Sequence, residues 1–402
     1  TLDVPAIYSD DQFTQELQLL FTGERWSGVA GLFYLDGTSS GVFDTIAGNL
    51  GVVIAAAGSV ETESFSAFAD FSFDLSDRLH ASIGGRYTRD DKTGEVFRAF
   101  YLGATRSPLT GGTPRAILQT RTNYTASDTF EQFTPRASIS YDFSDDLTGY
   151  ASVGQGFKSG GWDMRGDAFL VPQTVNGYEP ETVTTYEIGL KGSAFDRRLS
   201  FASAVFYSDF KDQQITTQQV ATPPATGIAS VVDNAGASTI YGFELEGTAY
   251  LTDSLTSTVS LGYLKNEFDE FITLVTGTPV DISNSRTPQN SPEWSAFWSL
   301  THSSTVAGGD LRITPSVSYR SDFHLFDAPD PVLDQDGYAL VDLAIIWRAP
   351  SGAYEFGVVG RNLTDEEYKV GGYNFAGATF NNSISAFYGP PRTVSASVTL
   401  RF

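Results

Sequence analysis

Residues 153–162, with the sequence VGQGFKSGGW, surround a lysine and a serine with glycines, as phosphate-binding loops do. A nucleotide-binding P-loop requires the pattern G-x-x-x-x-G-K-[ST], because its backbone N–H groups must wrap the phosphates at the start of a helix. Here Phe157 occupies the position of the glycine before Lys158, and Gly160 and Gly161 follow where the helix must begin. The pattern fails on both sides, so we predict that these glycines end a β-strand instead.

An acidic loop is the second place where the residue types suggest chemistry. Five aspartates lie within residues 322–337, namely Asp322, Asp327, Asp330, Asp334 and Asp336. Carboxylate oxygens are the ligands that Ca²⁺ prefers, but the spacing does not match the loop of an EF-hand. A solvated acidic loop and a Ca²⁺ site both stay open, and we favour the solvated loop.

The remaining reactive side chains do not form a catalytic set. The three histidines, His80, His302 and His324, are far apart in the sequence, and the chain has no cysteine. We find no nucleophile, base or cluster of metal ligands at a recognisable spacing. We therefore predict neither an enzyme nor a protein with a bound metal or cofactor.

Composition narrows the class of protein. The 402 residues include 25 basic and 48 acidic side chains, and the net charge of −23 argues against nucleic acid as a partner. The absence of cysteine excludes a disulfide scaffold. The longest apolar run, around residues 51–58, is much shorter than the roughly 20 residues that a membrane-spanning helix needs. Because the chain begins with Thr1, we expect it to be processed or part of a longer protein.

Segments of about ten residues with alternating polar and apolar side chains recur along the chain, and we count fifteen of them. The last segment, VSASVTLRF, shows the pattern, because Val394, Ala396 and Val398 alternate with serine and threonine. A period of two is that of a β-strand with one apolar face.

Short and long connections alternate between these segments. The long ones are approximately residues 36–63, 89–131, 159–182, 212–238, 269–291, 322–337 and 369–389. Outer-membrane β-barrels have short periplasmic turns and long extracellular loops. A soluble β-sandwich has no reason to sort its loops by length onto two ends. We therefore predict an all-β fold, an antiparallel transmembrane β-barrel.

Charged side chains within the predicted strands fall on the face opposite the apolar one. An arginine that faces lipid near the bilayer midplane costs about 2 to 4 kcal/mol, so the charged face must look into the lumen. The residues that we predict to face the lumen are Arg86, Arg136, Glu244, Glu246, Arg312 and Arg361. Aromatic residues near strand ends, such as Tyr141, Tyr263, Trp294 and Trp347, suit the interfacial girdle of a barrel.

Several phrases in the sequence point to a family. RYTRDDK, TPRASISYDFSDDLTGYASVGQGFKSGGWDMR, YEPETVTTYEIGLKG, YGFELEG, GRNLTDEEY and YGPPRTVSASVTLRF follow one another along nearly the whole chain. In this order they resemble the barrel of TonB-dependent outer-membrane receptors. The resemblance implies about 22 strands. An even strand number is also what barrel closure requires. We therefore expect residues 1–402 to be a partial barrel domain without the plug domain, the TonB box and about seven strands.

The resemblance also implies a function. We expect a receptor in the outer membrane of a Gram-negative bacterium that takes up a ferric siderophore or another iron complex. The energy would come from a TonB-type energising protein, which acts through the missing N-terminal part. A passive porin of about 16 strands is the alternative. Outer-membrane lipid, lipopolysaccharide and the barrel-assembly machinery are the other implied partners.

Candidate ligand contacts follow from the expected positions of the extracellular loops. Aromatic side chains at loop bases suit ligands with π faces or hydroxyl groups. The candidates are Trp162, Arg165, Tyr178, Tyr373, Phe375 and Tyr388. Lys158 and Arg165 are expected near lipopolysaccharide phosphates or an anionic ligand, with Gly160 and Gly161 at positive φ where the chain leaves the strand. The terminal Phe402 is expected to be the assembly signal.

Overall fold

The structure, a computed structural model, describes residues 2–48, 50–113, 115–220, 228–275, 278–375 and 383–401. Its main sheet has 17 strands, of which β1 (Leu2–Asp3) and β12 (Thr278–Asp281) are short. The long strands are β2 (Ala6–Thr22), β3 (Trp26–Ala47), β4 (Val52–Asp74), β5 (Leu79–Leu102), β6 (Ile117–Ser144), β7 (Leu147–Lys158), β8 (Glu181–Ala194), β9 (Leu199–Val220), β10 (Ile228–Thr252), β11 (Leu255–Val275), β13 (Trp294–Val306), β14 (Gly309–Arg320), β15 (Tyr338–Arg348), β16 (Tyr354–Arg361) and β19 (Thr393–Leu400). A separate hairpin consists of β17 (Lys369–Phe375) and β18 (Ser383–Tyr388). The 3₁₀ turns are η1 (Pro108–Thr110), η2 (Pro172–Asn176) and η3 (Ser283–Ser285).

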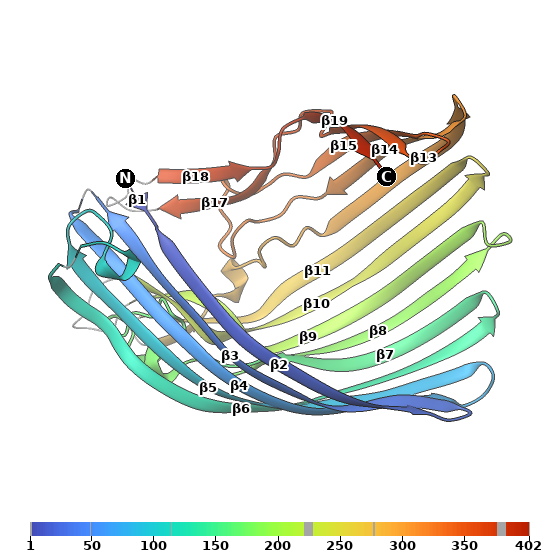
Figure 1. Ribbon diagram of the computed structural model, residues 1–402. Helices are drawn as coiled ribbons and strands as arrows, with labels where there is room; N and C mark the ends of the chain where they lie inside the picture. Colours follow the sequence, from blue (N-terminus) through green and yellow to red (C-terminus); the bar gives the residue numbers. More distant parts are fainter. Residues whose placement is uncertain are drawn as a thin grey trace.

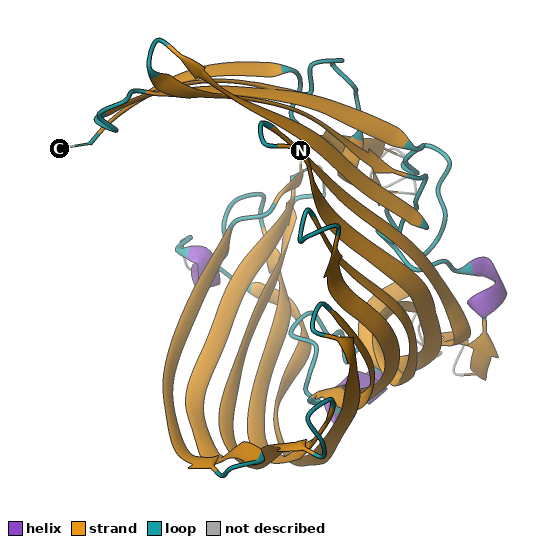
Figure 2. Cartoon of the chain, turned by 90° about the vertical axis from the view of Figure 1, so that its right-hand side faces the viewer, coloured by secondary structure: helices purple, strands orange, loops and turns teal. Residues whose placement is uncertain are grey.

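The long strands pair antiparallel with their sequence neighbours, and together they form one curved wall (Figures 1 and 2). Each of the fifteen alternating segments lies within one long strand, except for up to three residues at a segment end, so the predicted strand count and the antiparallel barrel sheet are confirmed. Tight turns join the strands at one end of the wall, as the turns at the right of Figure 1 show. At one of these turns Ala307 and Gly308 have positive φ of 51° and 77°, which reverses the chain in two residues.

The strands extend further than the sequence pattern indicated. Most of the predicted loop 36–63 is strand, because β3 and β4 are separated only by residues 48–51. The predicted loop 89–131 likewise reduces to residues 103–116. These extensions contain polar stretches such as DGTSSG at 36–41, so they lack the apolar alternation of a lipid-facing strand. The boundaries of these long loops were therefore predicted wrongly.

The pairing registers place the six charged residues predicted to face the lumen on one face of the sheet. Gly84 pairs with Arg136, which puts Arg136 on the face of Arg86, because residues two apart on a strand share a face. The registers from β7 to β16 put the other four there as well, namely Glu244, Glu246, Arg312 and Arg361. We call this side of the sheet the charged face. That it looks into the lumen stays a prediction.

Aromatic side chains gather on the opposite face. Tyr263 pairs with Trp294 across β11 and β13, with ring centroids 4.9 Å apart, and Phe243 packs against both rings. Trp294 is 40% exposed, as an interfacial aromatic is expected to be. Among the residues that the structure describes, no helix is long and apolar enough to span a membrane.

The loop between β7 and β8, residues 159–180, folds back onto the charged face of β5 and β6. Lys92 donates from Nζ to the carbonyl oxygen of Gly160 at 3.0 Å. A Cβ on Gly94 would lie 2.6 Å from Cε3 of Trp162, so the indole ring rests directly on the backbone of β5. Lys92 and Gly94 share the face of Arg86. The β7–β8 loop is therefore packed against the charged face of this wall.

A buried ion pair fixes the β7–β8 loop. Arg121 on β6 donates to the carboxylate of Asp167 with an Nη2–Oδ2 distance of 2.9 Å, and the two side chains are 9% and 4% exposed. The guanidinium also lies over the rings of Phe100 and Phe169, at 5.0 and 4.4 Å from their centroids. Removing one partner of such a pair leaves a buried charge without compensation, which is strongly destabilising.

Gly160 is needed for space, and neither Gly160 nor Gly161 adopts positive φ. A Cβ on Gly160 would lie 2.4 Å from the carbonyl oxygen of Tyr178 and from Cε1 of Phe130. Gly161 N–H donates to that same carbonyl oxygen at 2.9 Å. The predicted positive φ at the strand exit was wrong, because the two ends of the β7–β8 loop pair here as an isolated β-bridge.

We predict that the substitution Asp167→Asn releases the β7–β8 loop. It leaves Arg121 buried without its carboxylate, which costs about 3 kcal/mol and raises the open population of the loop roughly 100-fold. Trypsin cleavage after Arg165, measured on the folded whole gene product by mass spectrometry, is expected to accelerate accordingly. Asp253→Asn is the matched control, because Asp253 pairs with Arg198 at a turn where its side chain is 96% exposed. Equal cleavage rates in the two variants would contradict the role of Asp167.

The outer strands of the series are β2 and β19. Residue pairing joins β2 to β3 and β19 to β16, and no register within the described residues joins β2 to β19. Almost every residue of β2 and every residue of β19 is exposed.

We predict that residues 1–402 expressed alone present two open strand edges and aggregate or fail to insert into membranes. Heat-modifiable migration on a gel is the measurement, and a stable heat-modifiable monomer in detergent would show that the fragment closes by itself.

Candidate ligand-binding site

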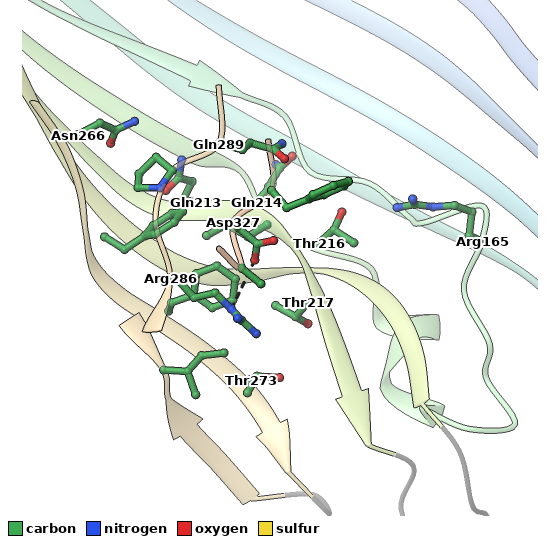
Figure 3. Close-up of a pocket in the computed structure, with 17 residues that line it drawn as sticks. Arg165, Gln213, Gln214, Thr216, Thr217, Asn266, Thr273, Arg286, Gln289 and Asp327 are labelled. Atoms are coloured by element: carbon green, nitrogen blue, oxygen red, sulfur yellow. Dashed lines mark ion pairs between the residues drawn. The ribbon is translucent and has the colours of Figure 1, made fainter. Parts of the chain in front are cut away.

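A cavity of about 720 Å³ lies between β9, β11 and the loops that follow β12 and β14 (Figure 3). Asn266 in its wall pairs with Ile240, which shares the charged face with Glu244, so the cavity opens on that face. The β7–β8 loop adds Arg165 to the lining. Pockets for small molecules have volumes of about 300–1,000 Å³, and this cavity falls within that range.

Arg165 is held at the cavity by Asp163. The Nε and Nη2 atoms of Arg165 donate to the two carboxylate oxygens of Asp163 at 3.0 and 3.2 Å. The same carboxylate accepts the backbone N–H of Val232 on β10 at 3.2 Å, and its side chain is only 5% exposed. Asp163 therefore links the β7–β8 loop to the sheet and fixes the direction of the Arg165 guanidinium.

Arg286 enters the cavity from the loop after β12. Its guanidinium lies over the ring of Phe271, 5.6 Å from the centroid, and its Nε is 3.5 Å from Oδ2 of Asp327. Nε is buried and makes no hydrogen bond within the described residues. Figure 3 shows the Arg286 side chain in the middle of the lining residues.

The loop that carries Arg286 is itself fixed by a carboxylate. Asp281 accepts the backbone N–H groups of Ser283 and Phe271 at 2.9 and 3.2 Å. These hydrogen bonds hold the pKa of the Asp281 carboxyl below its usual value. Thr287 N–H donates to the carbonyl oxygen of Asp327 at 2.8 Å, which ties this loop to the one after β14.

Amide side chains form the wall on β9 and β11. Gln214 donates from Nε2 to the carbonyl oxygens of Ser159 and Glu179, both at 3.0 Å. Its backbone N–H donates to Glu181 at 2.7 Å, so Gln214 anchors both ends of the β7–β8 loop to β9. Gln213 and Asn266 lie beside it in the lining, together with the rings of Phe268 and Phe271.

Of the predicted ligand contacts, Arg165 alone belongs to this lining. Trp162 is 6% exposed and packs on the ring of Phe130, with centroids 6.5 Å apart. Tyr178 pairs with Gly161, and burial, together with the nearby Asp163 carboxylate, raises the pKa of its hydroxyl. Trp162 and Tyr178 both contact other residues of the β7–β8 loop. Their roles as ligand contacts stay predictions.

The other predicted contacts lie on the β17–β18 hairpin. Tyr373 and Tyr388 are 54% and 57% exposed, and the ring of Tyr373 meets that of Phe387 edge-on at 5.6 Å. Phe375 ends β17, and its side chain lies outside the described residues, as does Phe402. The hairpin is tied to the preceding loop, since Lys369 Nζ donates to the carbonyl oxygen of Asp334 at 2.6 Å.

Three of the five aspartates in loop 322–337 make side-chain contacts within the protein. Oδ2 of Asp334 lies 2.9 Å from Nδ1 of His324, and Asp327 forms an ion pair with Arg286. Asp330 accepts a hydrogen bond from Nδ2 of Asn374 at 2.6 Å. Within the described residues, no group of three or more acidic or histidine side chains comes close enough to hold a metal ion. These contacts give the acidic loop a structural role.

Sequence reasoning missed most of the cavity lining. Gln213 and Gln214 belong to the polar stretch KDQQITT, which looks like an ordinary loop in the sequence. Arg286 and Asp327 come from loops that are far apart along the chain. The one available signal was that Arg286 is the only basic residue between Lys265 and Arg312, in a strongly acidic chain.

Comparisons with known proteins agree with this architecture. The family model described as TonB dependent receptor-like, beta-barrel matches residues 4–388. The chain is 24% identical over 320 residues to the pesticin receptor of Yersinia pestis, covering 80% of this chain and 42% of that protein. It is 25% identical over 270 residues to the metal-pseudopaline receptor CntO of Pseudomonas aeruginosa, covering 67% of this chain and 33% of that protein. The chain thus spans less than half the length of these relatives.

A solved structure shares the fold. The ferric yersiniabactin uptake receptor FyuA from Yersinia pestis superposes with a TM-score of 0.77 at 20% identity. The match covers 100% of this chain and 55% of that one. Since the family model spans nearly the whole chain, the chain belongs to the TonB-dependent receptor β-barrel family.

Proposed function

We propose that the chain is the barrel part of an outer-membrane receptor that takes up a metal chelate, with a ferric siderophore or another iron complex as the ligand. The cavity on the charged face carries this proposal. Its walls combine guanidinium, amide and phenyl groups, which suit a polar ligand with apolar parts. The related receptors for pesticin, metal-pseudopaline and ferric yersiniabactin support the same class of function.

The location and partners belong to the same proposal. The protein is assigned to the outer membrane of a Gram-negative bacterium, with the long connections outside and the charged face toward the lumen. A TonB-type energising protein is the partner that its family supports. Residues 1–402 are a partial barrel domain, with lipopolysaccharide near Lys158 and the barrel-assembly machinery acting on Phe402.

The proposal is tested by uptake of radioactive iron. The whole gene product is expressed in a host that lacks its own iron receptors, and uptake from a panel of ferric chelates is measured with and without an uncoupler of the inner membrane. Energy-dependent uptake of at least one chelate is expected.

Thr216→Trp fills the cavity and is expected to lower uptake about tenfold or more, because the ligand loses its contact surface.

Thr252→Trp is the matched control, because Thr252 is exposed at the turn between β10 and β11, far from the cavity lining. Uptake in this variant is expected to equal that of the wild type. Uptake that survives the uncoupler and rises linearly with concentration would instead indicate the passive porin.

A further inference from the structure

We propose that the ligand of this cavity is an anionic chelate whose carboxylate groups bind between Arg165 and Arg286. This inference rests on the proposed function and adds the chemical class of the ligand. The two guanidiniums reach the same cavity from different loops, Arg165 from residues 159–180 and Arg286 from residues 282–293. Guanidinium groups bind carboxylates through two parallel hydrogen bonds, which fixes the orientation of the bound group.

The lining is richer in basic side chains than the protein as a whole. The whole chain has a net charge of −23, whereas the cavity lining contains two guanidiniums and one carboxylate, that of Asp327. Each guanidinium has a carboxylate beside it, Asp163 at Arg165 and Asp327 at Arg286. The cavity therefore offers a ligand the N–H donors that these ion pairs leave over.

Arg165 is presented to the cavity with hydrogen-bonding capacity to spare. Asp163 accepts from Nε and Nη2, so the third nitrogen, Nη1, remains for a ligand. The Arg165 side chain is 49% exposed, while the Asp163 side chain is 5% exposed. Asp163 thus fixes the direction of the Arg165 guanidinium, while its own side chain stays buried.

Arg286 is only partly neutralised. Its ion pair with Asp327 is 3.5 Å long, and the buried Nε makes no hydrogen bond among the described residues. The ring of Phe271 covers one face of the guanidinium, which leaves the edge of the group free to donate. A quarter of the side chain is exposed, enough for a ligand to reach the terminal nitrogens.

A neutral chelate fits this site poorly for an energetic reason. A ligand that fills the cavity removes water from the N–H donors that the two ion pairs leave over, and a donor that loses water without gaining an acceptor is penalised. A carboxylate replaces the lost water with charge-assisted hydrogen bonds. The site therefore discriminates by charge, even among chelates of similar size.

The test compares chelates of different charge on the whole gene product in detergent. The probes are ferric citrate and ferric EDTA, which carry carboxylates, and ferrichrome, a neutral hydroxamate chelate. Binding is followed by quenching of tryptophan fluorescence. We expect Arg165→Gln and Arg286→Gln each to weaken carboxylate binding about tenfold or more, as loss of a charge-assisted hydrogen bond does. Arg198→Gln is the control, since Arg198 lies at a turn between strands and is not in the lining.

Asp163→Asn tests the positioning role. It is expected to weaken carboxylate binding while heat-modifiable migration of the barrel stays that of the wild type. Arg165→Lys is expected not to restore wild-type affinity, because a lysine cannot form the paired hydrogen bonds to Asp163 and direct a further N–H to the ligand from a fixed position. Recovery of full affinity in Arg165→Lys would contradict the positioning of Arg165 by Asp163.

The outcomes separate this inference from the proposed function. Carboxylate binding that depends on both arginines supports the inference. Ferrichrome binding that equals or exceeds carboxylate binding, with no loss in the arginine variants, would overturn the ligand class and leave a receptor. Binding of none of the probes by a wild-type protein that does take up iron in cells would also overturn the ligand class. Absence of both binding and uptake would remove the proposed function itself.

Discussion

Lateral hydrogen bonding between neighbouring strands is the constraint on which this structure depends. A backbone that crosses lipid has no water to satisfy its N–H and C=O groups, so each strand must pair with the next along its whole length. Because paired residues lie on the same face of the sheet, continuous pairing also fixes which side chains of each strand share a face with those of its neighbour. The charges on β5, β6, β10, β14 and β16 therefore share one face, although they are spread along the chain from Arg86 to Arg361.

The paired wall gives the loops a rigid base. The residues that hold the β7–β8 loop, Arg121 on β6, Gln214 on β9 and Lys92 on β5, all sit on strands with long ladders. Arg165 reaches the cavity because these contacts fix both ends and the middle of its loop. Side chains on a rigid scaffold keep their geometry better than side chains on free loops. The ladder that membrane insertion demands is thus also what orders the site.

The strand pattern was predictable because it is local. Alternation over ten residues is visible in segments such as VSASVTLRF, and it identified all the long strands and their charged residues. The strand extensions in β3 to β6 were not predictable in this way, since outside lipid there is no demand for an apolar face. The cavity was harder still, because Arg165, Asn266 and Arg286 meet only through tertiary contacts. The packing of Trp162 could not be read from the sequence either, because its ring lies against Phe130, which comes from a different strand, β6.

The acidic composition takes on a specific meaning around the site. Asp163 pairs with Arg165, Asp167 with Arg121, and Asp327 with Arg286, so the arginines of this region each have a carboxylate partner. The pair formed by Asp167 is largely buried and stabilises the fold of the β7–β8 loop. The pairs formed by Asp163 and Asp327 leave part of the guanidinium open to the cavity. These ion pairs therefore differ in how far the arginine is buried. The largely buried Arg121 fixes the β7–β8 loop, whereas the more exposed Arg165 and Arg286 keep N–H donors toward the cavity, where we propose that the ligand binds.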